Sequence, residues 1–171
     1  MPTLSSARLL LPELPLSVVQ ERLEQDSFSA RLVLPDGPLE VTFPASWPGD
    51  ALPIFPELLR SGDSTRQFVL IDRFPGLAVG LMGSKGGPDE HGDLEIGYGL
   101  NPECWGQGYA TEALQALLPH WQASPGVRRV TAETSVSNVA SGRVLEKCGF
   151  VQVGEDWNQD DGPLLLWATE P

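Results

Sequence analysis

The spacing of apolar residues along the chain separates strand-like segments from helix-like ones. Short apolar runs at 66–72, 77–83 and 93–100 predict strands, and the first two flank an Arg-Phe-Pro-Gly turn that predicts a hairpin. From Gly108 to about Gln122 the period changes, because apolar residues recur at steps of three and four, which predicts a helix with one buried face. This face consists of Ala110, Ala113, Leu114, Leu117, Leu118 and Trp121.

Capping residues predict two further helices. Asn138 is a preferred N-cap for a helix over 138–150, and Gly149 is suited to the left-handed conformation that ends such a helix. Ser17 is the predicted cap of a shorter helix over 17–25.

The remaining segments complete a mixed pattern. The proline-rich stretch 34–56 predicts turns, with one short helix near 50–60. Further strands are predicted at 7–14, at 127–134 and on both sides of the acidic loop at 156–162. A strand meander followed by strand–helix–strand–helix–strand predicts the α/β (α+β) class, with a mixed sheet of about six or seven strands flanked by helices. The length predicts a single domain over 1–171.

Composition and net charge restrict the classes of molecule that this domain can bind. The net charge is −12 and the pI is near 4.4, which argues against binding to nucleic acid or to anionic membranes and favours a cationic partner. No apolar run has the length of a membrane span and the first residues do not resemble a signal peptide, so we predict a cytoplasmic protein. Cys104 and Cys148 form no CxxC pair, so neither a disulfide framework nor a metal site is predicted.

Two glycines lie one residue apart between strand 93–100 and the following helix. In "CWGQGYATEA", residues 104–113, Gly106 and Gly108 leave backbone N–H groups uncovered at a helix N-terminus, where the dipole adds partial positive charge. Such loops bind anions, and Thr111 adds a hydroxyl donor. Neither the P-loop nor the dinucleotide G-x-G-x-x-G pattern is present. The residues alone thus indicate a pyrophosphate site or a tight turn.

Two segments of the chain resemble the GNAT superfamily of N-acetyltransferases. They are "EIGYGLNPECWGQGYATEAL" and "NVASGRVLEKCGF". The likeness is greatest to the branch of ribosomal-protein alanine acetyltransferases, where the loop usually reads W-G-x-G-Y-A-T-E-A, whereas the wider family has Arg or Gln in place of Trp105. The resemblance is strong over a cofactor-binding core at 66–155 and weak over 1–65.

The resemblance implies a GNAT fold whose sheet splays at a cleft for acetyl-CoA. In that fold the glycine loop holds the pyrophosphate, the strand ending at Leu100 bonds the pantetheine arm through its backbone, and Asn138 contacts the arm besides capping its helix. The implied cofactor-binding residues are Tyr98, Leu100, Gly106, Gln107, Gly108, Tyr109, Ala110, Thr111 and Asn138.

Acetyl transfer to an amine requires a neutral amine, a donor to the oxyanion and a proton for the leaving thiolate. We predict that a backbone amide of the strand, near Ile96 to Tyr98, donates to the oxyanion. Glu95 is the first candidate for the base, acting through a water, and Glu133 and Asp93 are alternatives. A solvated position on a strand is an equally good interpretation of Glu95.

The proton for the thiolate comes, in much of the family, from a tyrosine of the second motif. That position is Leu145 here. The resemblance assigns the role to Ser141, which from its position alone is an ordinary residue of a first helical turn.

The acceptor is predicted to bind between the proline-rich segment near 40–60 and the hairpin that carries Trp157, Asp160 and Asp161. Trp47 and Trp157 are predicted to offer aromatic faces to a protonated amine, which the carboxylates attract. The predicted reaction is direct acetylation of a primary amine, either a peptide N-terminus, a polyamine or another small amine, by a monomer or homodimer.

Two other functions remain open at this point. The replacement by Leu145 and the divergent first 60 residues are compatible with a non-catalytic CoA-binding module on the same fold. The glycine loop is also compatible with a nucleotide-phosphate binder unrelated to CoA.

Overall fold

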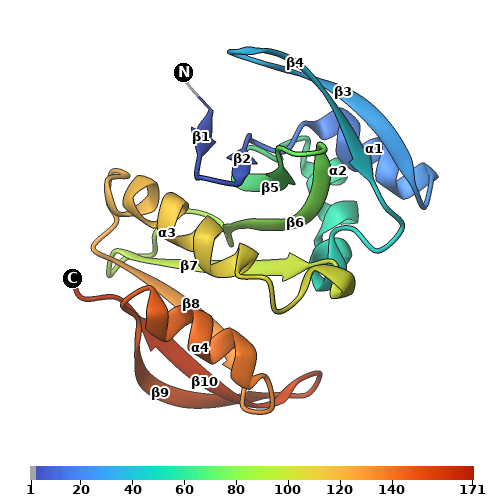
Figure 1. Ribbon diagram of the computed structural model, residues 1–171. Coiled ribbons are helices and arrows are strands. Elements are labelled where there is room, and N and C mark those ends of the chain that lie inside the picture. Colours follow the sequence, from blue (N-terminus) through green and yellow to red (C-terminus); the bar gives the residue numbers. More distant parts are fainter. Residues whose placement is uncertain (1–2) are drawn as a thin grey trace. The chain divides into compact units, whose positions relative to one another are not determined.

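The computed structural model describes residues 3–171, which form two compact units (Figure 1). Unit 1 extends up to Gly83 and includes Tyr98–Ala116, whereas unit 2 consists of Ser84–Gly97 and Leu117–Pro171. The strand β7 (Asp93–Leu100) and the helix α3 (Tyr109–Gln122) contribute residues to both units. The single domain over 1–171 stays a prediction.

The sheet of unit 1 is built mainly from antiparallel pairs. β1 pairs with β2, β2 with β5 and β5 with β6, and the last pair is the hairpin predicted around the Arg-Phe-Pro-Gly turn. β4 pairs with β3 and makes one parallel contact with β6, between Thr42 and Leu77. The bounds are β1 (Leu4–Ser5), β2 (Leu9–Leu11), β3 (Phe28–Leu34), β4 (Gly37–Phe43), β5 (Gln67–Asp72) and β6 (Leu77–Ser84).

In the β3–β4 hairpin, β4 corrects the prediction of turns over 34–56, whereas most of β3 precedes that stretch, where no element is predicted. In β3, partly buried or buried residues alternate with exposed ones, which is the period of a half-buried strand. The same alternation of apolar and polar residues can be read over much of this segment of the sequence. Pro38 is tolerated because it lies opposite Val33 next to the turn, near the end of a strand pair. With β1, this hairpin raises the number of strands among the described residues to ten, above the predicted six or seven.

Besides the first part of α3, unit 1 contains the helices α1 and α2 and a short 3₁₀ segment, η1. The predicted cap of α1 (Leu16–Glu24) is wrong, because the helix begins one residue earlier than predicted, at Leu16. Pro15 takes the N-cap position instead, and no side chain caps the helix. The predicted helix near 50–60 is confirmed as η1 (Gly49–Ile54) and α2 (Phe55–Ser61).

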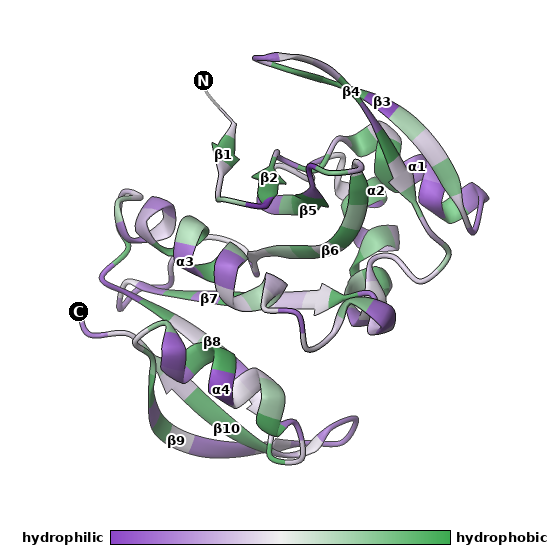
Figure 2. Cartoon of the chain, viewed as in Figure 1, coloured by the Kyte–Doolittle hydropathy of each residue, from purple (hydrophilic) through white to green (hydrophobic). Residues whose placement is uncertain are grey.

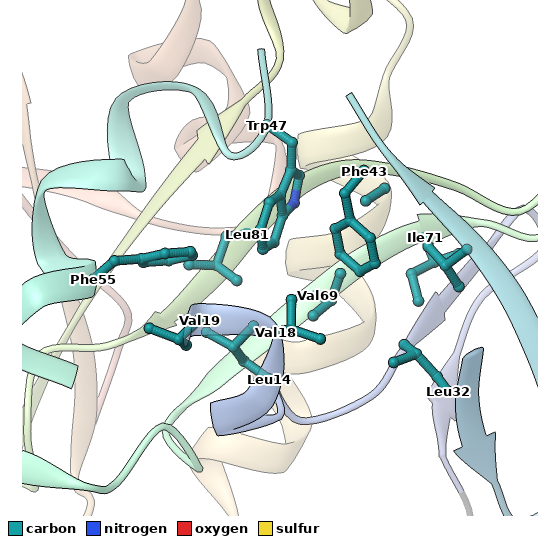
Figure 3. Packing of buried hydrophobic residues seen from close by; sticks show 12 residues of the cluster. Leu14, Val18, Val19, Leu32, Phe43, Trp47, Phe55, Val69, Ile71 and Leu81 are labelled. Atoms are coloured by element: carbon teal, nitrogen blue, oxygen red, sulfur yellow. The ribbon is translucent and has the colours of Figure 1, made fainter. Parts of the chain in front are cut away.

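The core of unit 1 gathers residues from α1, α2 and the strands around one aromatic group (Figure 3). Trp47 is fully buried and meets Phe43 and Phe55 edge-on, with ring centroids 4.7 Å and 5.5 Å away. Its indole N–H donates to the carbonyl of Gly80 at 2.9 Å, so the polar atom of this large side chain is satisfied inside the core.

Unit 2 contains the first part of β7, the last part of α3, three further strands and α4. β7 runs parallel to β8, with Leu94 opposite Val130, while β10 is antiparallel to both β8 and β9. Most of β9 is exposed, and Figure 2 shows both hydrophobic and hydrophilic stretches along it. The bounds are β8 (Arg129–Ser135), α4 (Val139–Lys147), β9 (Val151–Asn158) and β10 (Gly162–Ala168).

The two strongest helix predictions are confirmed. All six residues of the predicted apolar face of α3 are buried. In α4, the Asn138 side chain accepts a hydrogen bond from the backbone N–H of Ser141 at 3.2 Å, and Gly149 has a φ of 90°. Within residues 3–171, none of the helices combines the length and the apolar character that crossing a membrane requires.

Candidate functional site

The glycine loop of unit 1 begins where β7 ends. Asn101 is completely buried. Its side-chain amide donates to the carbonyl of Ala78 at 2.8 Å, and its backbone N–H donates to the carbonyl of Val79 at 2.9 Å. A short 3₁₀ turn, η2 (Pro102–Cys104), follows. These bonds fix the start of the loop on β6, so the loop leaves the sheet in one direction.

The two glycines of the loop have conformations that other residues rarely adopt. Gly106 has a φ of 74° and Gly108 a φ of 81°, both in the left-handed region. A Cβ atom on Gly106 would meet no heavy atom within 4 Å. The backbone is therefore approachable at this point, as a loop that contacts an anion through its N–H groups requires.

The loop continues directly into α3. The N–H of Glu112 donates to the carbonyl of Gly108 at 3.0 Å, and the N–H groups of Tyr109 and Ala110 precede this bond at the positive end of the helix. Trp105 is 60% exposed, and its indole N–H donates to Leu100 at 3.2 Å. The chemistry of these donors fits a phosphate or pyrophosphate group.

Two side chains of the loop serve its own structure. The amide of Gln107 donates to the carbonyl of Glu103 at 3.0 Å. The hydroxyl of Tyr109 donates to the carboxylate of Asp72, and this bond, together with burial, raises the pKa of Tyr109 to about 12. Gln107 and Tyr109 thus offer a ligand their backbone groups, as the prediction for the pyrophosphate requires.

Sequence reasoning missed Arg8, which lies beside this loop in unit 1. Its Nε donates to Glu112 Oε1 at 2.9 Å, its backbone N–H donates to Glu112 Oε2 at 2.9 Å, and its guanidinium carbon lies 4.4 Å from the centre of the Tyr109 ring. Arg8 and Glu112 are 104 positions apart, so no local pattern signals the pair. Its only trace in the sequence is a lone arginine at the start of an apolar strand.

Unit 2 contains the predicted base and its alternatives. Lys85 Nζ lies 3.0 Å from Glu95 Oε2, and Glu95 stands opposite Thr131 in the parallel pair. Desolvation, followed by the negative charge of Glu95, raises the pKa of Glu133. Asp93 is engaged elsewhere, because its carboxylate accepts two bonds from Arg129, at 2.7 Å and 3.1 Å, which lower its pKa.

Ser141, the residue predicted to protonate the thiolate, lies at the start of α4. Ser141 is half-buried in the first turn, and it is its backbone N–H, not its hydroxyl, that donates to Asn138. Leu145, which stands where the family has a tyrosine, is completely buried. Asn138 therefore caps the helix as predicted, and its contact with a cofactor stays a prediction.

The predicted acceptor residues differ in exposure. Trp47 belongs to the core of unit 1 and has no exposed surface, so the prediction that it offers an aromatic face to an amine is wrong. Proline-rich flanks suggested a surface loop, but burial of the indole against two phenyl rings is more favourable. In unit 2, Trp157 is 63% exposed at the end of β9, and Asp160 and Asp161 follow in the exposed turn.

Known proteins resemble this chain in both sequence and structure. The acetyltransferase (GNAT) domain family matches residues 48–151. The uncharacterized N-acetyltransferase YjdG of Bacillus subtilis is 34% identical over 112 residues, which are 61% of this chain and 67% of that protein.

Two solved structures share the fold at low sequence identity. RimL, a ribosomal L7/L12 alpha-N-protein acetyltransferase in complex with coenzyme A, is 18% identical, with a TM-score of 0.68 and coverage of 98% of this chain and 97% of that one. A chimeric spermidine N-acetyltransferase from Vibrio cholerae and hSSAT is also 18% identical, with a TM-score of 0.66 and 96% coverage of both chains.

The match of the family model includes both motifs noted in the sequence, the glycine loop before α3 and the segment that forms α4. It also covers more than half of the chain, and the predicted mixed fold is confirmed by the structural neighbours. The chain therefore belongs to the GNAT family of acetyltransferases.

Proposed function

We propose that this protein transfers the acetyl group of acetyl-CoA directly to a primary amine. The observation that carries the proposal is the glycine loop, whose backbone conformation, open approach at Gly106 and helix N-terminus suit a pyrophosphate, within a chain of the GNAT family. Acetyl-CoA supplies the activated acetyl thioester. The loop from Gly106 to Thr111 binds its pyrophosphate, and the backbone of Tyr98 and Leu100 binds the pantetheine arm.

A screen of amines tests this function. The protein is incubated with acetyl-CoA and with spermidine, small diamines and peptides of varied N-terminus, and release of the free thiol is measured. We expect thiol release that depends on at least one amine. Tight binding of CoA without turnover on any amine would support the non-catalytic module instead, and thermal stabilisation by ATP but not by CoA would support a nucleotide-phosphate binder.

The proposed acceptor is cationic. The exposed hairpin of unit 2 carries Glu155, Asp156, Asp160 and Asp161, and the net charge of the chain is −12. Such a surface attracts protonated amines and repels acidic molecules. The two structural neighbours are named as acetyltransferases of a ribosomal protein and of spermidine, and each name denotes an acceptor that is acetylated on nitrogen.

We propose that Ser141 protonates the leaving thiolate. The structure offers a clean test, because the cap of α4 uses the backbone N–H of Ser141, which alanine retains. In Ser141→Ala we therefore expect a lower kcat with unchanged affinity for CoA and unchanged thermal stability. Steady-state kinetics with the best amine from the screen, together with calorimetric titration of CoA, measures both quantities. A normal kcat would remove Ser141 from the mechanism.

We propose Glu95 as the base, with Glu133 as a second candidate because its pKa is raised. If Glu95 is the base, Glu95→Gln lowers kcat/KM most near neutral pH and less at high pH, where the amine is already neutral. If Glu133 is the base, the same substitution removes the negative charge that helps raise the pKa of Glu133, and the acid limb of the pH profile moves to lower pH. An equal loss at every pH would contradict both assignments.

A further inference from the structure

We infer that Arg8 binds a phosphoryl group of the CoA pyrophosphate, as a ligand additional to the backbone of the glycine loop. This inference rests on the proposed use of acetyl-CoA. It assigns a cofactor contact to the first strands of the chain, the part in which the resemblance to the family is weakest.

The first support is the position of the guanidinium. Arg8 Nη2 lies 3.4 Å from the place that a Cβ atom on Gly108 would occupy. The charged end of Arg8 is therefore beside the second glycine of the loop, next to the N–H groups that precede the first bond of α3.

The second support is that Glu112 uses only one of the N–H donors of the Arg8 guanidinium. Glu112 accepts from Nε of Arg8 and from its backbone N–H, and no other hydrogen bond of the Arg8 side chain is found among residues 3–171. A guanidinium has five N–H donors, so the Nη groups retain donors for a second anion. The side chain of Arg8 is 41% exposed, which leaves these donors accessible.

The third support is that Arg8 is held in place before any ligand binds. Ser6 and Arg8 both donate to Glu112, the guanidinium packs on the ring of Tyr109, and Tyr109 is bonded to Asp72. Arginine loses much conformational entropy when a flexible side chain is fixed by a ligand. Because folding has already ordered this side chain, binding of a phosphate meets little of that cost.

The test compares two variants that break the same ion pair from opposite sides. Arg8→Gln removes the positive charge, whereas Glu112→Gln keeps it and removes the neighbouring negative charge. We expect Arg8→Gln to weaken CoA binding about tenfold to hundredfold, the range of a hydrogen bond to a charged group. Glu112→Gln should weaken CoA binding much less than Arg8→Gln, because the positive charge remains and the glutamine oxygen can still accept a hydrogen bond from Arg8 Nε. Calorimetric titration with CoA measures both, and equal losses in the two variants would show that the pair is only structural, which overturns the inference.

Truncated cofactors locate the phosphate that Arg8 contacts. Dephospho-CoA lacks the 3′-phosphate and keeps the pyrophosphate, whereas S-acetylpantetheine lacks both. We expect Arg8→Gln to weaken the binding of dephospho-CoA as much as the binding of CoA. The KM for S-acetylpantetheine should stay unchanged. A loss that disappears with dephospho-CoA would overturn the assignment to the pyrophosphate. Failure of the wild-type protein to bind CoA would contradict the proposed function itself, which separates the two failures.

Discussion

Gly108→Asp is expected to abolish binding of CoA, with a loss of affinity greater than about a hundredfold. The new carboxylate would stand where the pyrophosphate is proposed to bind, and like charges brought together cost several kcal/mol. A Cβ atom at this position lies 3.4 Å from Arg8 Nη2, so the aspartate would also pair with the arginine proposed to bind the phosphate. Calorimetric titration with CoA measures the effect.

Gly108→Asn is the matched control for this substitution. Asparagine has the size of aspartate and, like it, tolerates a positive φ better than most residues, so both variants carry a similar backbone cost at a φ of 81°. We expect a clearly smaller loss in the asparagine variant because it lacks the charge. Unchanged affinity in Gly108→Asp, with circular dichroism showing a native fold, would contradict the assignment of the loop to the pyrophosphate.

Trp47→Ala is expected to destabilise the protein by about 3–5 kcal/mol, the range for removing a large aromatic side chain from a core. The indole is completely buried and meets two phenyl rings edge-on, and its truncation leaves a cavity and removes the hydrogen bond to the carbonyl of Gly80. Urea unfolding followed by circular dichroism measures the change.

Trp157→Ala is the control for an exposed tryptophan, and we expect its stability to stay within about 0.5 kcal/mol of the wild type. Where Trp47→Ala fails to fold, Trp47→Phe gives a smaller loss that is still measurable. A change below about 1 kcal/mol in Trp47→Ala would contradict the buried position of this side chain.

Sequence periodicity predicted the parts of the fold that depend on local order. The face of α3 and the cap and end of α4 follow from residues that lie three or four positions apart, and the structure confirms them. The prolines of 34–56 predict turns, and their number does not show that Pro38 lies beside the turn of a hairpin, where a strand tolerates it. The alternation in β3 was the better guide.

Contacts between distant parts of the chain account for the remaining errors. Trp47 is predicted to face an acceptor amine because it lies in the proline-rich segment near 40–60, whereas its neighbours in space are Phe43, Phe55 and Gly80. Arg8 was overlooked because Glu112 lies 104 positions away. The glycine loop itself was predicted, since a strand, two glycines and a helix N-terminus are consecutive in the chain.

The anchoring of the first turn of α3 has a consequence for how small an active fragment of this protein can be. The match to the family model begins at residue 48, yet Glu112 is held by Ser6 and Arg8, which precede that point by about 40 residues. A chain trimmed to the matched region would keep both glycines and lose the residues that hold the loop from outside. We therefore expect a fragment that still binds the cofactor to need the first two strands, which lie outside the segment that identifies the family.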